Sequence, residues 1–147
     1  MNRPLLVLNG PNLNRLGTRE PELYGRTTLA DVERACRAAA DPTPLLFRQS
    51  NSEAQLIDWV HEAIDAGARG IAVDPAGYSF TSVALVDALK MFPGPIIELH
   101  ITNIHRRDPI YRHSRVSGVA TAVIVGLGAR GYPVAVRSLL AMLDQPA

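Results

Sequence analysis

Two polar residues, Glu98 and His100, interrupt the apolar segment from Ile96 to Ile101. They are two positions apart, so on a β-strand their side chains point to the same face. A buried carboxylate needs a partner, and a hydrogen bond to the imidazole supplies one. Such a bond orients the ring and raises its basicity, which suits a general acid or base. The pattern fits a purely structural pair equally well.

The segment from Asn9 to Gly25 is polar, with three glycines and two prolines, and it follows the apolar run Leu5 to Leu8. A connection of this length inside a compact domain usually carries function. It holds Arg19 and Tyr24, and a guanidinium close to a phenol favours the phenolate, a base usable near neutral pH. Spacing alone favours the alternative, a surface tyrosine beside a solvated arginine.

The residues from Gly126 to Gly131 match the pattern G-x-G-x-x-G of dinucleotide-binding proteins. Only 16 residues follow, without a further strand, so the βαβ unit that the pattern requires is absent. We interpret the motif as a tight turn with close helix packing, and we predict no cofactor.

A basic run lies between Asn103 and Arg115, and its members are Arg106, Arg107, Arg112, His113 and Arg115. It could bind an anion, although such runs are more often solvated or lie between subunits.

The single cysteine, Cys36, has helical spacing with Leu29, Val32 and Ala39, which indicates a small core residue rather than a nucleophile. No spacing typical of a zinc site occurs, and we predict no metal.

Five short apolar segments predict buried parallel strands. They are 5–8, 45–47, 71–73, 96–101 and 120–125. Between and after them, helical patterns follow Thr28 and Ser52, which can serve as N-caps, and span about 81–90 and 134–143. Gly67 and Gly70 are expected to end the helix that Ser52 begins.

This alternation predicts an α/β fold, a flavodoxin-like three-layer sandwich with a five-stranded parallel sheet. Ligands bind beyond the carboxyl ends of the strands in such folds. That rule selects Asn9, Asn12, Asp74, Glu98 and His100, which should converge on one edge.

The composition fits one globular domain, residues 1–147, with 47% hydrophobic and 20% charged residues. The formal charge of +1 gives no indication of a nucleic-acid or membrane partner. No signal peptide or membrane-spanning run is evident, so we expect a cytoplasmic protein.

Four stretches taken together carry a family resemblance. They are Asn9 to Gly25, Arg48 to Glu53, Glu98 to His105, and Gly126 to Gly128. With them, nearly the whole chain resembles type II 3-dehydroquinate dehydratase. The resemblance implies a flavodoxin-like subunit with a lid loop at about 17–25, assembled as a dodecamer of trimers. It also implies a cofactor-free lyase of the shikimate or quinate pathway, which dehydrates a cyclic keto acid, 3-dehydroquinate, to 3-dehydroshikimate through an enolate.

The resemblance also assigns roles to residues. Tyr24 is similar to the base that removes the proton next to the ketone, and Arg19 to the group that favours its phenolate. Asn12 resembles the residue that holds a water against the enolate oxygen. His100 resembles the acid that protonates the departing hydroxyl, with Glu98 orienting it.

Three further positions follow from the same resemblance. The backbone at Ile101 and Thr102 would receive the substrate carboxylate. Asp87 resembles a residue that reaches the site of a neighbouring subunit.

The chain departs from the family at three substrate-contacting positions. The family has asparagine, histidine and arginine where this chain has Asp74, Phe80 and Tyr111. Phe80 removes hydrogen bonds worth about 0.5 to 1.5 kcal/mol each. Asp74 brings a like charge close to the substrate carboxylate unless it is protonated. Dehydroquinate should therefore bind poorly unless Arg112 swings in as a substitute.

Three hypotheses for the function remain at this point. The first is a lyase of the family acting on 3-dehydroquinate. The second is a paralogue that runs the same enolate chemistry on a different, less hydroxylated cyclic ketone. The third is a catalytically silent oligomeric binding module, against which the joint retention of the proposed catalytic residues argues.

Overall fold

The protein is built around one sheet of five parallel strands. In this computed structural model, which describes residues 2–18 and 20–145, the strand order is β2-β1-β3-β4-β5. The order is that of flavodoxin-like folds, so the predicted fold class is confirmed. The strands are β1 (Leu5–Asn9), β2 (Leu45–Gln49), β3 (Gly70–Asp74), β4 (Ile96–His100) and β5 (Ala122–Val125).

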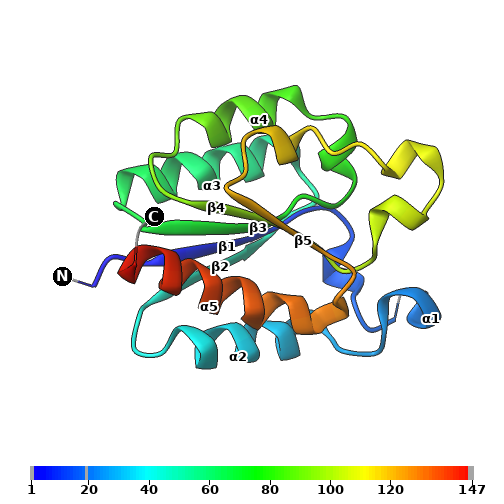
Figure 1. Ribbon diagram of the computed structural model, residues 1–147, viewed down its shortest axis with the longest axis horizontal. Coiled ribbons are helices and arrows are strands. Elements are labelled where there is room, and N and C mark those ends of the chain that lie inside the picture. The colour runs from blue at the N-terminus through cyan, green and yellow to red at the C-terminus, as the bar shows by residue number, and fades with distance from the viewer. Residues whose placement is uncertain (1, 19, 146–147) are drawn as a thin grey trace.

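Four long helices cover the two faces of the sheet (Figure 1). Helices α2 (Leu29–Ala40) and α5 (Gly131–Asp144) lie on one face, while α3 (Glu53–Asp65) and α4 (Val83–Lys90) lie on the other. Each face holds its own hydrophobic cluster. The result is the three-layer sandwich expected from the sequence.

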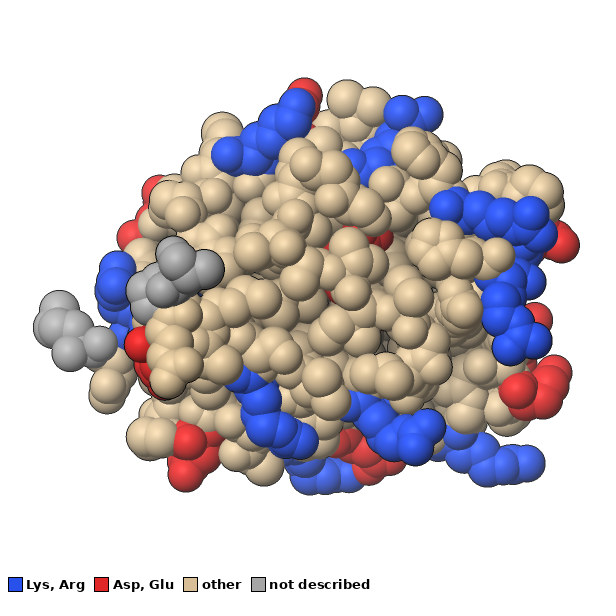
Figure 2. All heavy atoms as spheres, viewed as in Figure 1, with Lys and Arg blue, Asp and Glu red and all other residues tan. Residues whose placement is uncertain are grey.

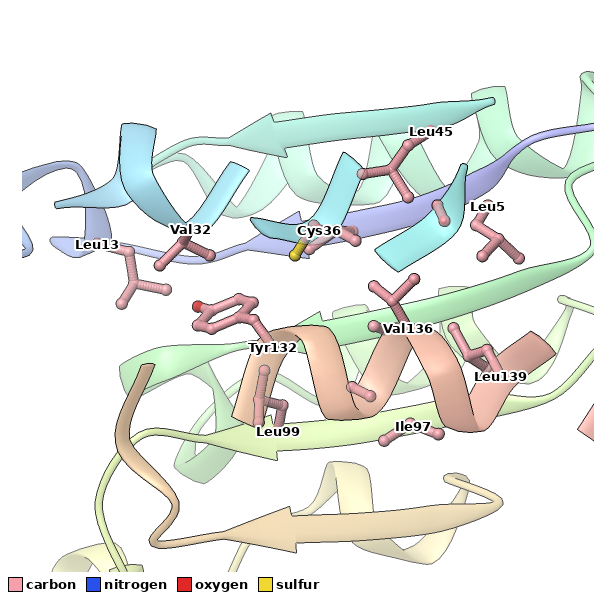
Figure 3. Packing of buried hydrophobic residues seen from close by; sticks show 14 of the residues in the cluster. Leu5, Leu13, Val32, Cys36, Leu45, Ile97, Leu99, Tyr132, Val136 and Leu139 are labelled. Atoms are coloured by element: carbon pink, nitrogen blue, oxygen red, sulfur yellow. The ribbon is translucent and has the colours of Figure 1, made fainter. Parts of the chain in front are cut away.

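Strand β1 shows how the two clusters divide between the faces. Its side chains alternate, so Leu5 and Val7 pack with α2 and α5, whereas Leu6 and Leu8 pack with α3 and α4. Figure 3 shows the first cluster, in which Leu5 lies near Leu139 of α5. All five residues of β1 are buried, which explains why the segment reads as continuously apolar up to Asn9.

The helix starts follow the predicted caps, with shifts of a few residues. The Thr28 side chain accepts a hydrogen bond from the backbone N–H of Asp31, and the Asp31 carboxylate accepts one from the backbone N–H of Thr28. The Ser52 side chain caps α3 by accepting a hydrogen bond from the backbone N–H of Gln55. Helix α4 begins two residues later than about position 81, because Ser82 serves as its cap. Helix α5 begins three residues before position 134, at Gly131.

The connection after β1, which the sequence indicated only as a polar segment, contains helical structure. Residues Leu13–Arg15 form a 3₁₀ helix, and Pro21–Tyr24 form the short helix α1. Pro21 sits at the first helical position, where its missing N–H costs nothing. Figure 1 shows α1 at the same end of the molecule as the loop after β4.

On the face seen in Figure 2, charged side chains of both signs lie mainly around the periphery and leave the centre largely uncharged, with several basic ones at the end where α1 lies. Within residues 2–18 and 20–145, no helix combines the length and apolar character needed to span a membrane.

The carboxyl ends of β1 and β3 meet at the point where the strand order reverses. Asn9 and Asp74 are register partners there, and the N–H of Gly10 donates to the carbonyl of Asp74 at 2.8 Å. A Cβ atom on Gly10 would lie 2.4 Å from the backbone oxygen of Pro75. Position 10 therefore admits no side chain without separating the two strand ends.

We predict that Gly10→Ala destabilises the fold by about 1 to 3 kcal/mol, because the clash is with backbone and not with a flexible side chain. The shift in urea midpoint at an unchanged m-value measures this effect. Gly118→Ala is the matched control, since a Cβ there meets nothing within 4 Å, and it should stay within about 0.5 kcal/mol of wild type. Equal effects of the two changes would refute the close-approach explanation.

Candidate active site

A cavity of about 240 Å³ opens at the carboxyl ends of β1, β3 and β4, where the fold class predicts a ligand site. It is lined from four segments that lie far apart in the sequence. The lining residues are Pro11, Asn12, Leu13, Tyr24, Asp74, Ala76, Gly77, Phe80, Ile101, Thr102, Arg107 and Tyr111. Seven of the residues singled out from the sequence are therefore brought together here.

The Glu98 and His100 side chains form the expected pair beside this cavity. The imidazole Nε2 of His100 lies 2.5 Å from a carboxylate oxygen of Glu98, and the Ser117 hydroxyl donates to the other oxygen. The side chain of His100 is 5% exposed and that of Glu98 is fully buried. Both groups point to the α3 and α4 face, as their spacing predicts.

The electrostatics of this pair favour its charged form. Burial disfavours the charged form of His100, but the hydrogen bond to Glu98 and the neighbouring carboxylates outweigh it and raise the pKa of the imidazole. Burial likewise opposes ionisation of Glu98, but hydrogen bonds from His100, Ser114 and Ser117 lower the pKa of its carboxyl group.

These two shifts set a pH window for the stability that the pair contributes. The raised pKa of His100 stabilises the fold fully below about pH 6.5, and this contribution is lost as the pH rises through the native pKa. The lowered pKa of Glu98 stabilises the fold above about pH 4.3, and this contribution is lost as the pH falls through the native pKa.

Aromatic rings form one wall of the cavity. The Phe80 ring stacks near the His100 imidazole, with ring centroids 6.3 Å apart, and meets the Tyr111 ring edge-on at 5.5 Å. Two of the three positions at which this chain departs from the family that it resembles thus contact each other, and Phe80 separates His100 from part of the cavity.

Arg107 lines the cavity, although the sequence indicated it only as one member of the basic run between Asn103 and Arg115. Its guanidinium carbon lies 4.1 Å from the centroid of the Tyr111 ring and 5.8 Å from that of Tyr24. These are cation–π distances, so Arg107 bridges helix α1 and the loop after β4. Nothing in the sequence distinguishes it from its neighbour Arg106.

Arg112 does not line the cavity. Its Nε donates a hydrogen bond of 2.6 Å to the backbone oxygen of Arg107. It therefore supports the backbone of Arg107, and of the described arginines it is Arg107, not Arg112, that lines the cavity.

Asp74 is buried at the floor of the cavity, on the α2 and α5 side of the sheet. One of its carboxyl oxygens accepts the N–H of Ala76 at 3.1 Å, and the other lies 3.1 Å from the Tyr132 hydroxyl. Burial raises the pKa of Asp74, and the nearby His100 opposes this effect without cancelling it. Ala76 has a φ of 51°, a costly backbone conformation for a residue other than glycine.

Tyr132 is a second residue that the sequence did not identify. It lies in the first turn of α5, is 1% exposed, and touches both Asn9 and Asp74 through its hydroxyl. In Figure 3 its hydroxyl oxygen points toward the end of the sheet where the strands terminate. From the sequence, an aromatic residue in an amphipathic helix is interpreted as a core residue. Its polar partners Asn9 and Asp74 become evident only in the folded structure.

Asn12 and Tyr24 reach the cavity from the connection after β1. Asn12 adopts a left-handed backbone conformation with a φ of 71°, which asparagine tolerates better than most residues. Its N–H donates to the Asn51 side chain at 2.9 Å, which ties the connection to the segment after β2.

Like Arg112, Asp87 does not line the cavity, and it was predicted to reach the site of a neighbouring subunit instead. Asp87 is exposed on α4 and forms an ion pair with Lys90 at 3.7 Å. Arg19 lies outside the described residues. No cluster of three or more His, Cys, Asp or Glu side chains is arranged for a metal ion in the described part of the chain.

Comparison with known proteins identifies close similarities. Residues 3–140 match the family model described as dehydroquinase class II. The chain is 52% identical over 141 residues to "3-dehydroquinate dehydratase 2" of Agrobacterium fabrum, covering 95% of each chain. It is 51% identical to "3-dehydroquinate dehydratase" of Streptomyces coelicolor, over 96% of this chain and 91% of that one.

A solved structure is also similar. The type II dehydroquinase from Propionibacterium acnes superposes with a TM-score of 0.89 at 37% identity, covering 99% of both chains.

We predict that Glu98→Gln lowers the pKa of His100, because the amide keeps an acceptor near the ring but removes the negative charge. Titration of the imidazole by NMR measures the change, with the resonance assigned by its loss in His100→Gln. Glu62→Gln on α3, whose side chain is 46% exposed and pairs with Arg48, is the control and should leave the titration unchanged. An unaltered His100 titration in Glu98→Gln would contradict the assignment of Glu98 as its stabilising charge.

Proposed function

The chain belongs to the class II dehydroquinase family, and from this premise we propose that it is a lyase that dehydrates 3-dehydroquinate to 3-dehydroshikimate. The curated relatives at about half identity are named for this activity. Their names do not favour the paralogue with another cyclic ketone or the silent module.

One observation of the site carries the proposal. Tyr24 and Asn12, from the connection after β1, line the same cavity as Ile101 and Thr102, which directly follow the His100 strand. The proposed proton acceptor Tyr24 thus lines the cavity, and the proposed donor His100 lies beside it behind the Phe80 ring. That arrangement suits removal of a proton and loss of a hydroxyl from one bound ring.

We assign the base to Tyr24. Its phenolate would take the proton next to the ketone, leaving an enolate whose oxygen is stabilised by a water held at Asn12. The role proposed for Arg19 is to favour this phenolate, and the guanidinium of Arg107 lies over the same ring, 5.8 Å from its centroid.

We assign the acid to His100, held as an imidazolium by Glu98. As the enolate collapses to the enone, the carbon–oxygen bond breaks and His100 supplies the proton with which the hydroxyl leaves as water. Because the imidazole is nearly buried and Phe80 lies against it, the Phe80 ring must shift for a substrate hydroxyl to reach it.

The substrate carboxylate would lie at the backbone of Ile101 and Thr102, beside Asp74. Phe80 and Tyr111 supply an apolar wall where the family resemblance leads us to expect hydrogen-bond donors. In this arrangement Arg107, and not Arg112, is the residue that we assign to binding the ring hydroxyls of the substrate.

We further propose that the subunit assembles into trimers and then a dodecamer, with Asp87 reaching a neighbouring site. Its exposure on α4, 67% for the side chain, supports this role, as does its absence from the lining of its own cavity. Three further expectations stay predictions. They are that residues 1–147 form one domain, that residues 17–25 form its lid, and that the protein is cytoplasmic.

Tyr24→Phe should lower kcat for 3-dehydroquinate by about 10²- to 10⁴-fold, the usual contribution of a positioned base. The conjugated enone product is followed by its near-ultraviolet absorbance. Tyr78→Phe removes a hydroxyl that bonds the Asn51 backbone outside the cavity lining, and it should keep most of the activity.

Two results would weigh against the assignment. Full activity of Tyr24→Phe would remove Tyr24 as the base. An inactive wild type that gains activity when Asp74→Asn, Phe80→His and Tyr111→Arg are combined would favour the paralogue with a different ketone.

Gel filtration with light scattering should give an assembly far larger than the 15.9 kDa chain. Asp87→Ala should reduce turnover while the assembly stays intact, because its proposed contact is with the neighbour's substrate. The exposed Asp58→Ala on α3 is the control. An active, stable monomer would exclude a role for Asp87 in a neighbouring site.

A further inference from the structure

Three buried polar side chains form a chain of contacts below the cavity. The Tyr132 hydroxyl oxygen lies 2.8 Å from Oδ1 of Asn9 and 3.1 Å from Oδ2 of Asp74. All three residues are at most 4% exposed. Every proton in these contacts must therefore come from the protein.

The orientation of the Asn9 amide is fixed by its other contact. Its Nδ2 donates to the backbone oxygen of Arg48 at 3.0 Å, and that oxygen can only accept. Turning the amide over would place two oxygens against each other at this distance. The Asn9 oxygen therefore faces Tyr132 and can only accept a hydrogen bond.

Counting protons then decides the state of Asp74. The Tyr132 hydroxyl has one proton and lies between two oxygens. If Asp74 is ionised and Tyr132 donates its proton to Asn9, no proton lies between Tyr132 and Asp74. If Tyr132 donates its proton to Asp74 instead, no proton lies between Tyr132 and Asn9. A buried oxygen pair without a proton is unfavourable. A proton on Oδ2 of Asp74 satisfies both contacts, with Asp74 donating to Tyr132 and Tyr132 donating to Asn9.

We propose that Asn9 and Tyr132 hold Asp74 as a neutral carboxylic acid, and that this neutral state is what lets the cavity accept an anionic keto acid. The role of this state in binding the keto acid, the second part, rests on the proposed function, whereas the neutral state of Asp74, the first part, does not. Asp74 lines the cavity together with Ile101 and Thr102, where the substrate carboxylate is placed. A neutral acid avoids the repulsion that an aspartate would exert at this position.

The charged groups around Asp74 agree with this state. Glu98 and His100 on β4 face each other and form a pair of net zero charge, so His100 is not an unopposed cation for Asp74. Arg107 approaches from the loop after β4 and is engaged with two aromatic rings.

The groups on the helix side stay protonated. Burial raises the pKa of Tyr132 well above its ordinary value, and burial raises that of Cys36 on α2 to about 12. Burial also raises the pKa of Asp74 itself. Of the groups on this side of the sheet, Asp74 is the one whose ionisation would change the cavity.

A measurement without substrate tests the first part. In protein containing isotope-labelled aspartate, the Asp74 carboxyl resonance is assigned by its loss in Asp74→Asn and is followed by NMR through a pH titration. We expect it to remain in the protonated position through the range in which exposed aspartates have already ionised. Titration at the ordinary value of about 3.9 or below would overturn the proposal.

Thermal unfolding supplies a second measurement. A native pKa above the unfolded value means that the folded state holds more protons, so stability falls as the pH rises between the two values. The Tm of wild type should therefore fall relative to the Tm of Asp74→Asn as the pH rises above about 4. A constant Tm difference across this range would also overturn the proposal.

Kinetics test the second part. The KM for 3-dehydroquinate should rise about tenfold per pH unit above the Asp74 titration point, if only the neutral form binds. The rise should be absent in Asp74→Asn and retained in the control Asp58→Asn, which alters an exposed residue on α3. The same KM profile in Asp74→Asn and wild type would refute the role in binding. A complete lack of turnover in all three proteins would count against the proposed function, while the NMR titration still decides the state of Asp74.

Discussion

Both faces of the parallel sheet are covered by helices, so a polar side chain within it is cut off from water and needs a partner in the protein. This constraint shapes the whole site. On the α2 and α5 face, Tyr132 satisfies Asn9 and Asp74. On the α3 and α4 face, Ser117 and the imidazole of His100 satisfy Glu98. The chemistry is concentrated where the strands end because only there can such groups also reach a ligand.

The two networks hold their protons in opposite ways. The pair of Glu98 and His100 is stabilised in its charged form by three hydrogen bonds to the carboxylate. Asp74 has a single backbone donor and a hydroxyl whose proton is already committed to Asn9. Two carboxyl groups on adjacent strands thus acquire different protonation states from their partners, which is how one small cavity can combine a proton donor with a site for an anion.

The sequence was informative where local physics decides the outcome. The caps at Thr28 and Ser52, the five strands and the pairing of Glu98 with His100 follow from side-chain type and spacing, and the structure has them all. Arg107 and Tyr132 could not be recognised in this way. One sits in a run of similar arginines and the other resembles a core aromatic, so their roles depend on contacts between distant segments. Helix α1 was missed because four residues carry no periodicity.

Helix α1 belongs to the segment that we propose as a lid, and its length bears on how that lid would open. A helix of four residues is far below the length that is stable by itself in water. Its order therefore depends on side-chain contacts such as that between Tyr24 and Arg107. Opening the lid would then be a local unfolding event and not the rotation of a rigid flap. A ligand that touches Tyr24 would close the lid by completing the folding of this helix, so substrate affinity and local chain order are linked in a single equilibrium.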